Sequence, residues 1–184
     1  STAANRAVNL PEFANIAYDD LISINVPAVD WRKPLNRGKE LLNKGEPQQA
    51  LKLFTESLRQ NSTQAQTHFL MGRALDELKR TDKAVEHYAK ALKLDPQHFP
   101  SHNELGVVLD RQGKFDQAID HFRKAAAADP TSAFAHNNWG KTLMNLGKID
   151  QAIAHFRKAQ KIDPADAMAR ICLEKALRKQ GANR

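Results

Sequence analysis

The sequence predicts an all-α solenoid, in which four similar helix-turn-helix units are followed by a C-terminal cap helix and preceded by an extended arm. The chain is similar to itself at a spacing of 34 residues, which gives units 31–64, 65–98, 99–132 and 133–166. In each unit, apolar residues recur at three- and four-residue steps on both sides of a short polar break, as two amphipathic helices require. Three of the four units end in Asp-Pro, where proline stops the helix.

Five columns of matched residues define the repeat frame. They are Gly38, Gly72, Gly106 and Gly140; Leu41, Leu75, Leu109 and Leu143; Ala50, Ala84, Ala118 and Ala152; Phe54, Tyr88, Phe122 and Phe156; and Ser57, Ala91, Ala125 and Ala159. Small residues allow helices to approach closely, and large residues fill the space beside them. The columns therefore predict one packing scheme, repeated in every unit.

The break between the two helices of a unit carries turn residues. Three breaks contain a glycine that suits a left-handed helix end, namely Gly45, Gly113 and Gly147. Three second helices have an aspartate that we expect to cap their start, namely Asp82, Asp116 and Asp150. The second unit departs from this pattern, because Lys79 stands where the others have glycine.

These columns resemble the tetratricopeptide-repeat family over residues 31–166. The resemblance implies a right-handed superhelix whose first helices line a concave groove for an extended polypeptide. The segment 167–184 is similar to the cap helix and tail of such arrays, and we expect the helix to run from Ala167 to Gln180 and to end at Gly181.

The family's groove positions can be carried over to this chain. They are Asn36, Lys39, Phe69, Arg73, Asn103, Val107, Arg111, Phe134, Asn137, Asn138, Lys141, Met144 and Asn145, joined by Leu35, Leu70, Asp76, Glu104, Met168, Ile171 and Cys172. Asparagine can bond both the N–H and the C=O of a peptide, and the apolar neighbours offer shallow sockets. The clamp with which some relatives grip an acidic C-terminus is absent, because its positions hold Leu35, Lys39, Leu70, Pro100 and Glu104.

Residues 1–30 lie outside the repeat frame and form an acidic, apolar arm. They carry one base and four acids, a net charge of −3, whereas the rest of the chain carries +10. The arm is too apolar for a solvated tail. Its expected contact residues are Leu10, Phe13, Ile16, Tyr18, Leu21, Ile22, Ile24 and Val26. The arm either caps its own first unit or docks on a neighbouring copy, which builds rings or filaments.

Six of the seven histidines fall in two columns of the repeat. They are His68, His102 and His136 on first helices and His87, His121 and His155 on second helices. A metal ladder or a pH switch is conceivable, but residues of one column lie a full repeat apart, so packing or capping is favoured. The single cysteine, Cys172, excludes an internal disulfide and a cysteine-based zinc site. We expect no metal and no cofactor.

Other classes of function receive less support from the sequence. No catalytic motif is present, so we expect no enzyme. A basic ladder on the second helices could meet nucleic acid or an anionic surface: Lys90, Arg123, Lys124, Arg157 and Lys158. It lacks interleaved aromatic residues, and a solvated face is favoured. The expected partner is a protein or peptide, including another copy of the chain. No stretch is apolar enough to insert into a membrane. Because the chain starts at Ser1, the compartment stays open: cytoplasmic, or periplasmic or extracellular if a leader was removed.

Overall fold

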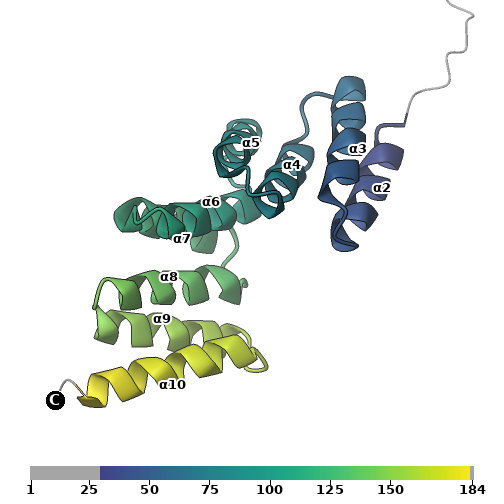
Figure 1. Cartoon of the computed structure of the whole chain (residues 1–184). Coiled ribbons are helices and arrows are strands. Elements are labelled where there is room, and N and C mark those ends of the chain that lie inside the picture. The colour runs from purple at the N-terminus through teal and green to yellow at the C-terminus, as the bar shows by residue number, and fades with distance from the viewer. Residues whose placement is uncertain (1–29, 183–184) are drawn as a thin grey trace, which may run out of the picture.

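The computed structural model describes residues 30–182, in which every regular element is a helix (Figure 1). The helices are α2 (Arg32–Asn43), α3 (Pro47–Gln60), α4 (Ala65–Glu77), α5 (Thr81–Leu94), α6 (Phe99–Arg111), α7 (Phe115–Ala128), α8 (Ala133–Asn145), α9 (Ile149–Ile162) and α10 (Ala167–Ala182). The predicted arm lies outside the described residues, apart from Asp30. No helix in the described part is long and apolar enough to cross a membrane.

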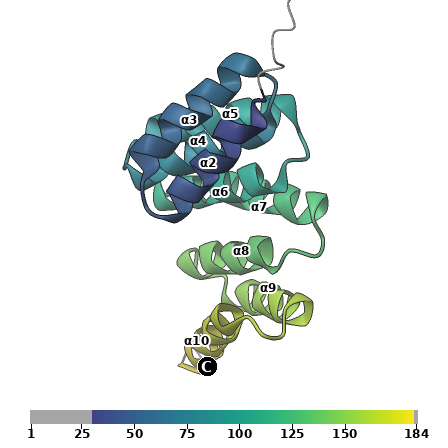
Figure 2. The same cartoon turned by 90° about the vertical axis from the view of Figure 1, so that its right-hand side faces the viewer.

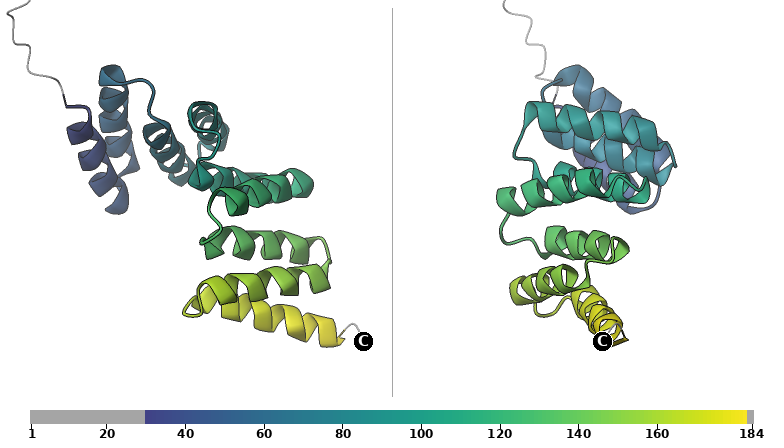
Figure 3. Two further views of the ribbon diagram at one scale, coloured as in Figure 1. Left: turned by 180° about the vertical axis from the view of Figure 1, so that it is seen from behind. Right: turned by 90° about the vertical axis from the view of Figure 1, so that its left-hand side faces the viewer.

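The helices form successive pairs that stack in chain order, from α2 and α3 to α8 and α9, with α10 closing the stack (Figures 2 and 3). Each first helix packs on its own second helix and also touches the first helix of the next pair. Among the described helices, no two second helices approach each other closely enough to bring their Cα atoms within 8 Å. The first helices therefore line the inner side of the curve and the second helices the outer side, which confirms the predicted all-α solenoid.

An aromatic ring on each second helix lies against a glycine on the first helix of the same unit. A Cβ atom placed on Gly38, Gly72, Gly106 or Gly140 would lie 2.5–2.6 Å from the nearest carbon of that ring. The rings belong to Phe54, Tyr88, Phe122 and Phe156, which are all 1% exposed or less. Only glycine fits at such a distance. The glycine column and the aromatic column of the sequence therefore pack directly against each other in every unit.

The turns between paired helices follow the predicted chemistry in part. Gly45, Gly113 and Gly147 adopt left-handed φ angles of 74–77°. Lys79 adopts φ 60° in the same place, a conformation that costs a side-chain-bearing residue about 1–2 kcal/mol. The aspartates were expected to cap the second helices, and this prediction was wrong. The capping positions are Arg80, Lys114 and Lys148, without a side-chain hydrogen bond, and Asp82, Asp116 and Asp150 lie in the first turn.

The cap helix α10 is longer than predicted. It continues through Gly181 to Ala182, and Gly181 does not adopt the left-handed conformation that would end the helix. Its buried residues Ala169, Cys172 and Ala176 pack on the last repeat, while Met168 and Ile171 are 50% and 43% exposed. The helix therefore covers α9 and leaves an apolar strip of its own uncovered.

We predict that Gly106→Ala destabilises the protein, because the added Cβ lies 2.6 Å from the buried Phe122 ring and the two helices must shift to make room for it. Overpacking of this kind costs about 1–3 kcal/mol, against a gain in helix propensity of up to about 1 kcal/mol. The control is Gly181→Ala, where nothing lies within 4 Å. Thermal melting of both variants tests the contact, and equal midpoints would contradict it.

Candidate functional site

Polar side chains of neighbouring first helices bind one another across the inner surface. Arg111 of α6 donates to both carboxylate oxygens of Asp76 on α4, at 2.7 and 2.8 Å. The Asn138 amide on α8 donates to Oδ1 of Asn103 on α6, at 3.1 Å. These contacts tie the second, third and fourth repeats together and leave a polar inner surface.

Two further links continue this network toward the C-terminus. Thr142 is fully buried, and its hydroxyl donates to Asp110 at 2.6 Å, joining α8 to α6. Asn137 donates to Asp166 at 2.7 Å, joining α8 to the turn before α10. Sequence reasoning did not single out Thr142 or Asp110 for this role. No pattern of residue types in the sequence predicts such a pair, because the contact depends on how two helices of different repeats cross.

The inner surface is hollowed between α6 and α8. Four of the predicted groove residues line this hollow, namely Val107, Arg111, Asn138 and Lys141, together with Asp110, Phe122 and Thr142. Val107 and the buried Phe122 ring make it apolar inside, and polar or charged groups surround them. The described part of the chain offers Lys141 no ion pair.

Charges of both signs meet beside this hollow. Burial raises the pKa of Glu104, although the Asn103 amide donates to its carboxylate at 3.3 Å and so favours the charged form. Arg73 and Arg111 also favour the charged carboxylate, and Asp76 opposes it. The surface therefore suits a partner with both polar and apolar groups better than a uniformly charged one.

The structure differs from the predicted groove at several positions. Phe69 is 8% exposed and packs on the Tyr88 ring, and Asn137 is 4% exposed. Leu35, Leu70 and Cys172 are also buried. These side chains face neighbouring helices, so they form the wall behind the inner surface and offer a peptide little area.

Six more of the predicted groove residues are not among those that line the hollow. Asn36 and Asn145 are exposed, and Lys39, Arg73 and Met144 are half-buried. Phe134 is 70% exposed and lines a different hollow of about 370 Å³, whose walls are Phe99, Asp129, Thr131, Ser132, Ala133, Asp163 and Asp166. The structure thus brings together four of the thirteen residues of the predicted binding set at one place.

The histidine columns meet in a way that the sequence analysis missed. Residues of one column lie a full repeat apart, whereas the structure pairs the two columns inside a repeat, with Nδ1–Nδ1 distances of 3.0–3.1 Å. The signal in the sequence was the constant spacing of 19 residues between the two members of each pair.

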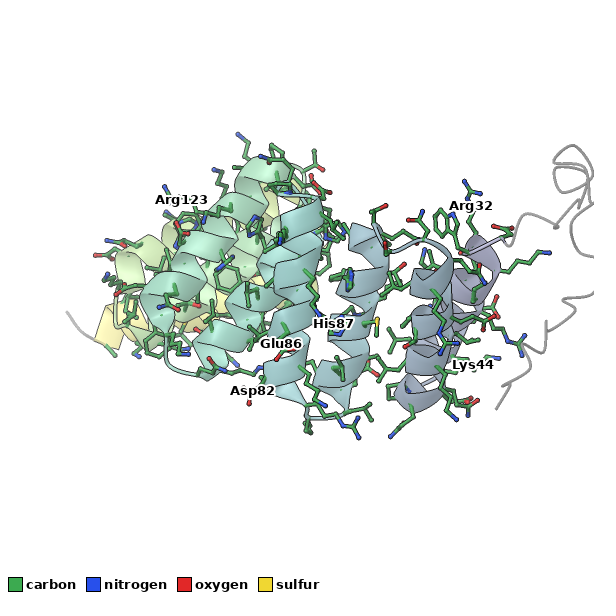
Figure 4. All side chains as sticks on the ribbon, turned by 90° about the horizontal axis from the view of Figure 1, so that it is seen from above. Arg32, Lys44, Asp82, Glu86, His87 and Arg123 are labelled. Atoms are coloured by element: carbon green, nitrogen blue, oxygen red, sulfur yellow. The ribbon has the colours of Figure 1, made fainter. Side chains whose placement is uncertain are left out.

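The outer basic ladder is partly neutralised. Arg123, which Figure 4 labels at the edge of the ribbon, and Lys124 both pair with Asp120. Hydrogen bonds from Lys124 and then Arg123 lower the pKa of this exposed carboxyl group. The fourth repeat has Ala154 at the equivalent position, so the ladder does not repeat as one uniform stripe.

Comparisons with known proteins agree with the repeat frame. A sequence profile described as Tetratricopeptide repeat matches residues 35–99, 69–133 and 103–167 in overlapping windows. A comparison with the curated proteins found no match.

Solved structures similar to this chain have the same kind of fold. MamA from residue 41 to its end, from Desulfovibrio magneticus RS-1, is 26% identical with a TM-score of 0.69 over 82% of this chain and 85% of that chain. The pilF protein of Pseudomonas aeruginosa is 20% identical, with a TM-score of 0.77 over 83% and 69% of the two chains. YrrB, described as a TPR protein with an unusual peptide-binding site, is 22% identical, with a TM-score of 0.64 over 76% and 72%.

The buried link between Thr142 and Asp110 predicts coupled effects on stability. We expect a double-mutant cycle of Thr142→Val and Asp110→Ala to give a coupling energy of about 1.5–3 kcal/mol, the range for a hydrogen bond to a charged group. Urea unfolding of the wild type, both single variants and the double variant measures it. Strictly additive effects would show that the link contributes nothing.

Proposed function

The chain belongs to the tetratricopeptide-repeat family, whose members generally mediate protein–protein interactions, and from this premise we propose that it is a scaffold that holds an extended polypeptide on its inner surface. Proteins of this family are typically not enzymes, which agrees with the absence of a catalytic motif from the sequence. One observation carries the proposal: Val107, Arg111, Asn138 and Lys141 line a single hollow between α6 and α8.

The two asparagines of this surface retain free hydrogen-bonding groups. Asn138 uses one N–H toward Asn103 and keeps its Oδ1 and second N–H, while Asn103 uses one N–H toward Glu104. An extended peptide presents alternating N–H and C=O groups, which such amides can bond in both directions. The hydrogen bond from Asn138 to Asn103 fixes the direction of both side chains before a peptide arrives, and this reduces the entropy lost on binding.

The hollow also indicates what kind of side chain the peptide should offer. Its apolar interior, formed by Val107 and Phe122, suits a small or medium apolar side chain. Lys141 at its edge suits a carboxylate. We therefore expect a segment that combines apolar and acidic residues. The description of YrrB as a TPR protein with an unusual peptide-binding site supports a peptide as the ligand by analogy.

A second candidate function is self-assembly through the arm, in which residues 10–26 of one copy dock on another. Exposed apolar side chains at the C-terminal end favour it: Phe134 at 70%, Met168 at 50%, Ile171 at 43% and Leu177 at 39% exposure. An apolar arm of charge −3 could be recruited by a body of charge +10. Binding of nucleic acid to the outer ladder is less favoured, because Asp120 already pairs with two of its cations.

We predict that Asn103→Ala with Asn138→Ala weakens peptide binding without changing the fold. The ligands are peptides that are selected from a random display library for binding to the full chain. Calorimetry then gives the Kd of each peptide. Each lost hydrogen bond is worth about 0.5–1.5 kcal/mol, so the Kd should rise roughly 5- to 150-fold.

The matched control for this experiment carries two substitutions on the outer side, Arg123→Ala and Lys124→Ala. It should bind the same peptides with unchanged Kd. If both variants lost the same affinity, or if the asparagine variant lost none, the peptide would not bind at the inner surface of α6 and α8.

We predict that the arm, if it joins copies, controls the size of the particle in solution. Sedimentation velocity of the full chain should then show large assemblies that grow with concentration, and a version lacking residues 1–27 should sediment as a monomer. A full chain that is monomeric at every concentration would rule out self-assembly and leave the peptide scaffold untouched.

A further inference from the structure

Three pairs of histidines join the two helices of the second, third and fourth repeats. Their Nδ1 atoms lie 3.1 Å apart for His68 and His87, 3.0 Å for His102 and His121, and 3.1 Å for His136 and His155. Figure 4 labels His87 on α5, whose partner His68 lies on α4. The first repeat has Pro34 and Leu53 at the equivalent positions. The fold of a repeat therefore does not require a histidine pair.

The two rings of each pair meet nitrogen to nitrogen. The ring centroids lie 5.2–5.3 Å apart. This distance exceeds the separation of the two Nδ1 atoms by about two ring radii, that is, by the distance from centre to nitrogen in each ring. Both nitrogens must then lie close to the line that joins the ring centres. An imidazole nitrogen directs its proton or its lone pair outward along this same direction. Each pair thus has the geometry of one straight N–H···N hydrogen bond.

The hydrogen bond of each pair requires a defined distribution of protons. A neutral imidazole has one N–H and one lone pair, so one member donates from Nδ1 and the other accepts at Nδ1. The second pair shows which is which. His102 Nε2 lies 3.2 Å from the Pro96 carbonyl oxygen and must donate its proton there, so its Nδ1 carries the lone pair. His121 is then the Nδ1 donor.

A metal ion fits this geometry less well than a proton. Because both nitrogens direct their lone pairs along the line that joins them, a bound ion would have to lie on that line, about 1.5 Å from each nitrogen, whereas zinc–nitrogen bonds are about 2.0–2.1 Å long. The described residues contain no group of three or more potential ligands around any pair. Cationic lysines also lie beside all three pairs: Lys90, Lys124 and Lys158.

We propose that the three histidine pairs are acid-sensitive clasps, which hold the two helices of each repeat together while at least one Nδ1 is unprotonated and open when both are protonated. The first added proton goes to the outward nitrogen of the donor ring and leaves the N–H···N bond intact. The second must go to the accepting Nδ1. Two N–H groups then face each other at a distance where two cations repel, and the rings must separate.

The surroundings of the pairs also oppose charging. Burial is the largest cause that lowers the pKa of all six histidines, to about 4 for His87, His121 and His155. Lys90 faces the first pair and Lys158 the third, and both lower the pKa further. The second pair also has Lys124 nearby, partly offset by Asp95 and Asp120. The Trp139 ring lies 4.0 Å from the ring of His155.

The sign of the pH effect follows from these directions. Unfolded histidines have a pKa of about 6.5, and the folded values are lower, so the unfolded chain binds more protons as pH falls. The stabilisation is complete above pH 6.5 and declines toward pH 4. Near pH 5 an unfolded pair holds close to two added protons and a closed clasp at most one. The unfolding equilibrium constant should then rise at least about 1000-fold for each unit by which the pH falls, with a factor of at least about ten from each clasp.

This inference does not depend on the proposed peptide. Its effect would nevertheless reach the inner surface, because Asn103 directly follows His102 on α6 and Asn137 directly follows His136 on α8. Opening a clasp changes how these helices sit on α7 and α9, and with them the neighbouring polar links.

The test is urea unfolding of the full chain at pH values from 7.5 to 4.5, for the wild type and for variants in which both members of one, two or three pairs are leucine. The first variant is His102→Leu with His121→Leu. Leucine is chosen because the first repeat has Leu53 at the position equivalent to His121. The proton uptake on unfolding should fall by at least about one for each pair removed. Unchanged uptake would overturn the proposal.

The control is His98→Asn, which removes the one histidine of the described residues outside the pairs and should lower the uptake by no more than one proton. A second measurement needs no variant. Nitrogen-15 NMR of the folded wild type at pH 7 should show one protonated and one bare Nδ1 in each pair, with coupling across the hydrogen bond. Two bare Nδ1 atoms in a pair, or six titrations near pH 6.5, would overturn the clasp even if the uptake falls as expected.

Discussion

The contact between a first-helix glycine and a second-helix aromatic ring determines how the two helices of each of the four repeats pack. It occurs four times, at Gly38, Gly72, Gly106 and Gly140, and each time a Cβ atom would come within 2.5–2.6 Å of the ring. Because the ring takes the place of a side chain, the two helices approach closely and the ring is fully covered. The glycines are therefore required by packing and not by backbone conformation, unlike Gly113 and Gly147, whose φ angles are positive.

This packing also decides where polar groups are left. Once the rings close each pair, the first helices lie near enough to the next first helices for direct contact, while the described second helices stay apart. Links such as Arg111 to Asp76 and Thr142 to Asp110 consequently gather on the inner side. The same closeness uses up much of the hydrogen-bonding capacity of the inner surface. Beside the hollow, Lys141 and parts of the Asn103 and Asn138 amides are left outside these links.

The repeat frame could be read from the sequence because each column has one physical role in all units. Roles within a helix were harder to read. Phe69 and Phe134 are both aromatic residues of first helices, yet one is 8% and the other 70% exposed, because they lie at different positions of the turn. Asn137 is buried while its neighbour Asn138 reaches the hollow. Exposure follows the repeat frame and not the residue type, because Leu35, Phe69 and Asn137 stand in one column and are all buried. The histidine pairs were missed for a different reason, since each pair links two columns.

The second to fourth repeats each hold their two helices by contacts of two kinds. The ring of Tyr88, Phe122 or Phe156 against glycine gains its energy from close packing, which does not change with pH. The histidine pair on the same two helices keeps its hydrogen bond only while one Nδ1 lacks a proton. Acid therefore removes one contact and leaves the other. A repeat built in this way should loosen before it unfolds, whereas the first repeat, with Pro34 and Leu53, has no comparable response.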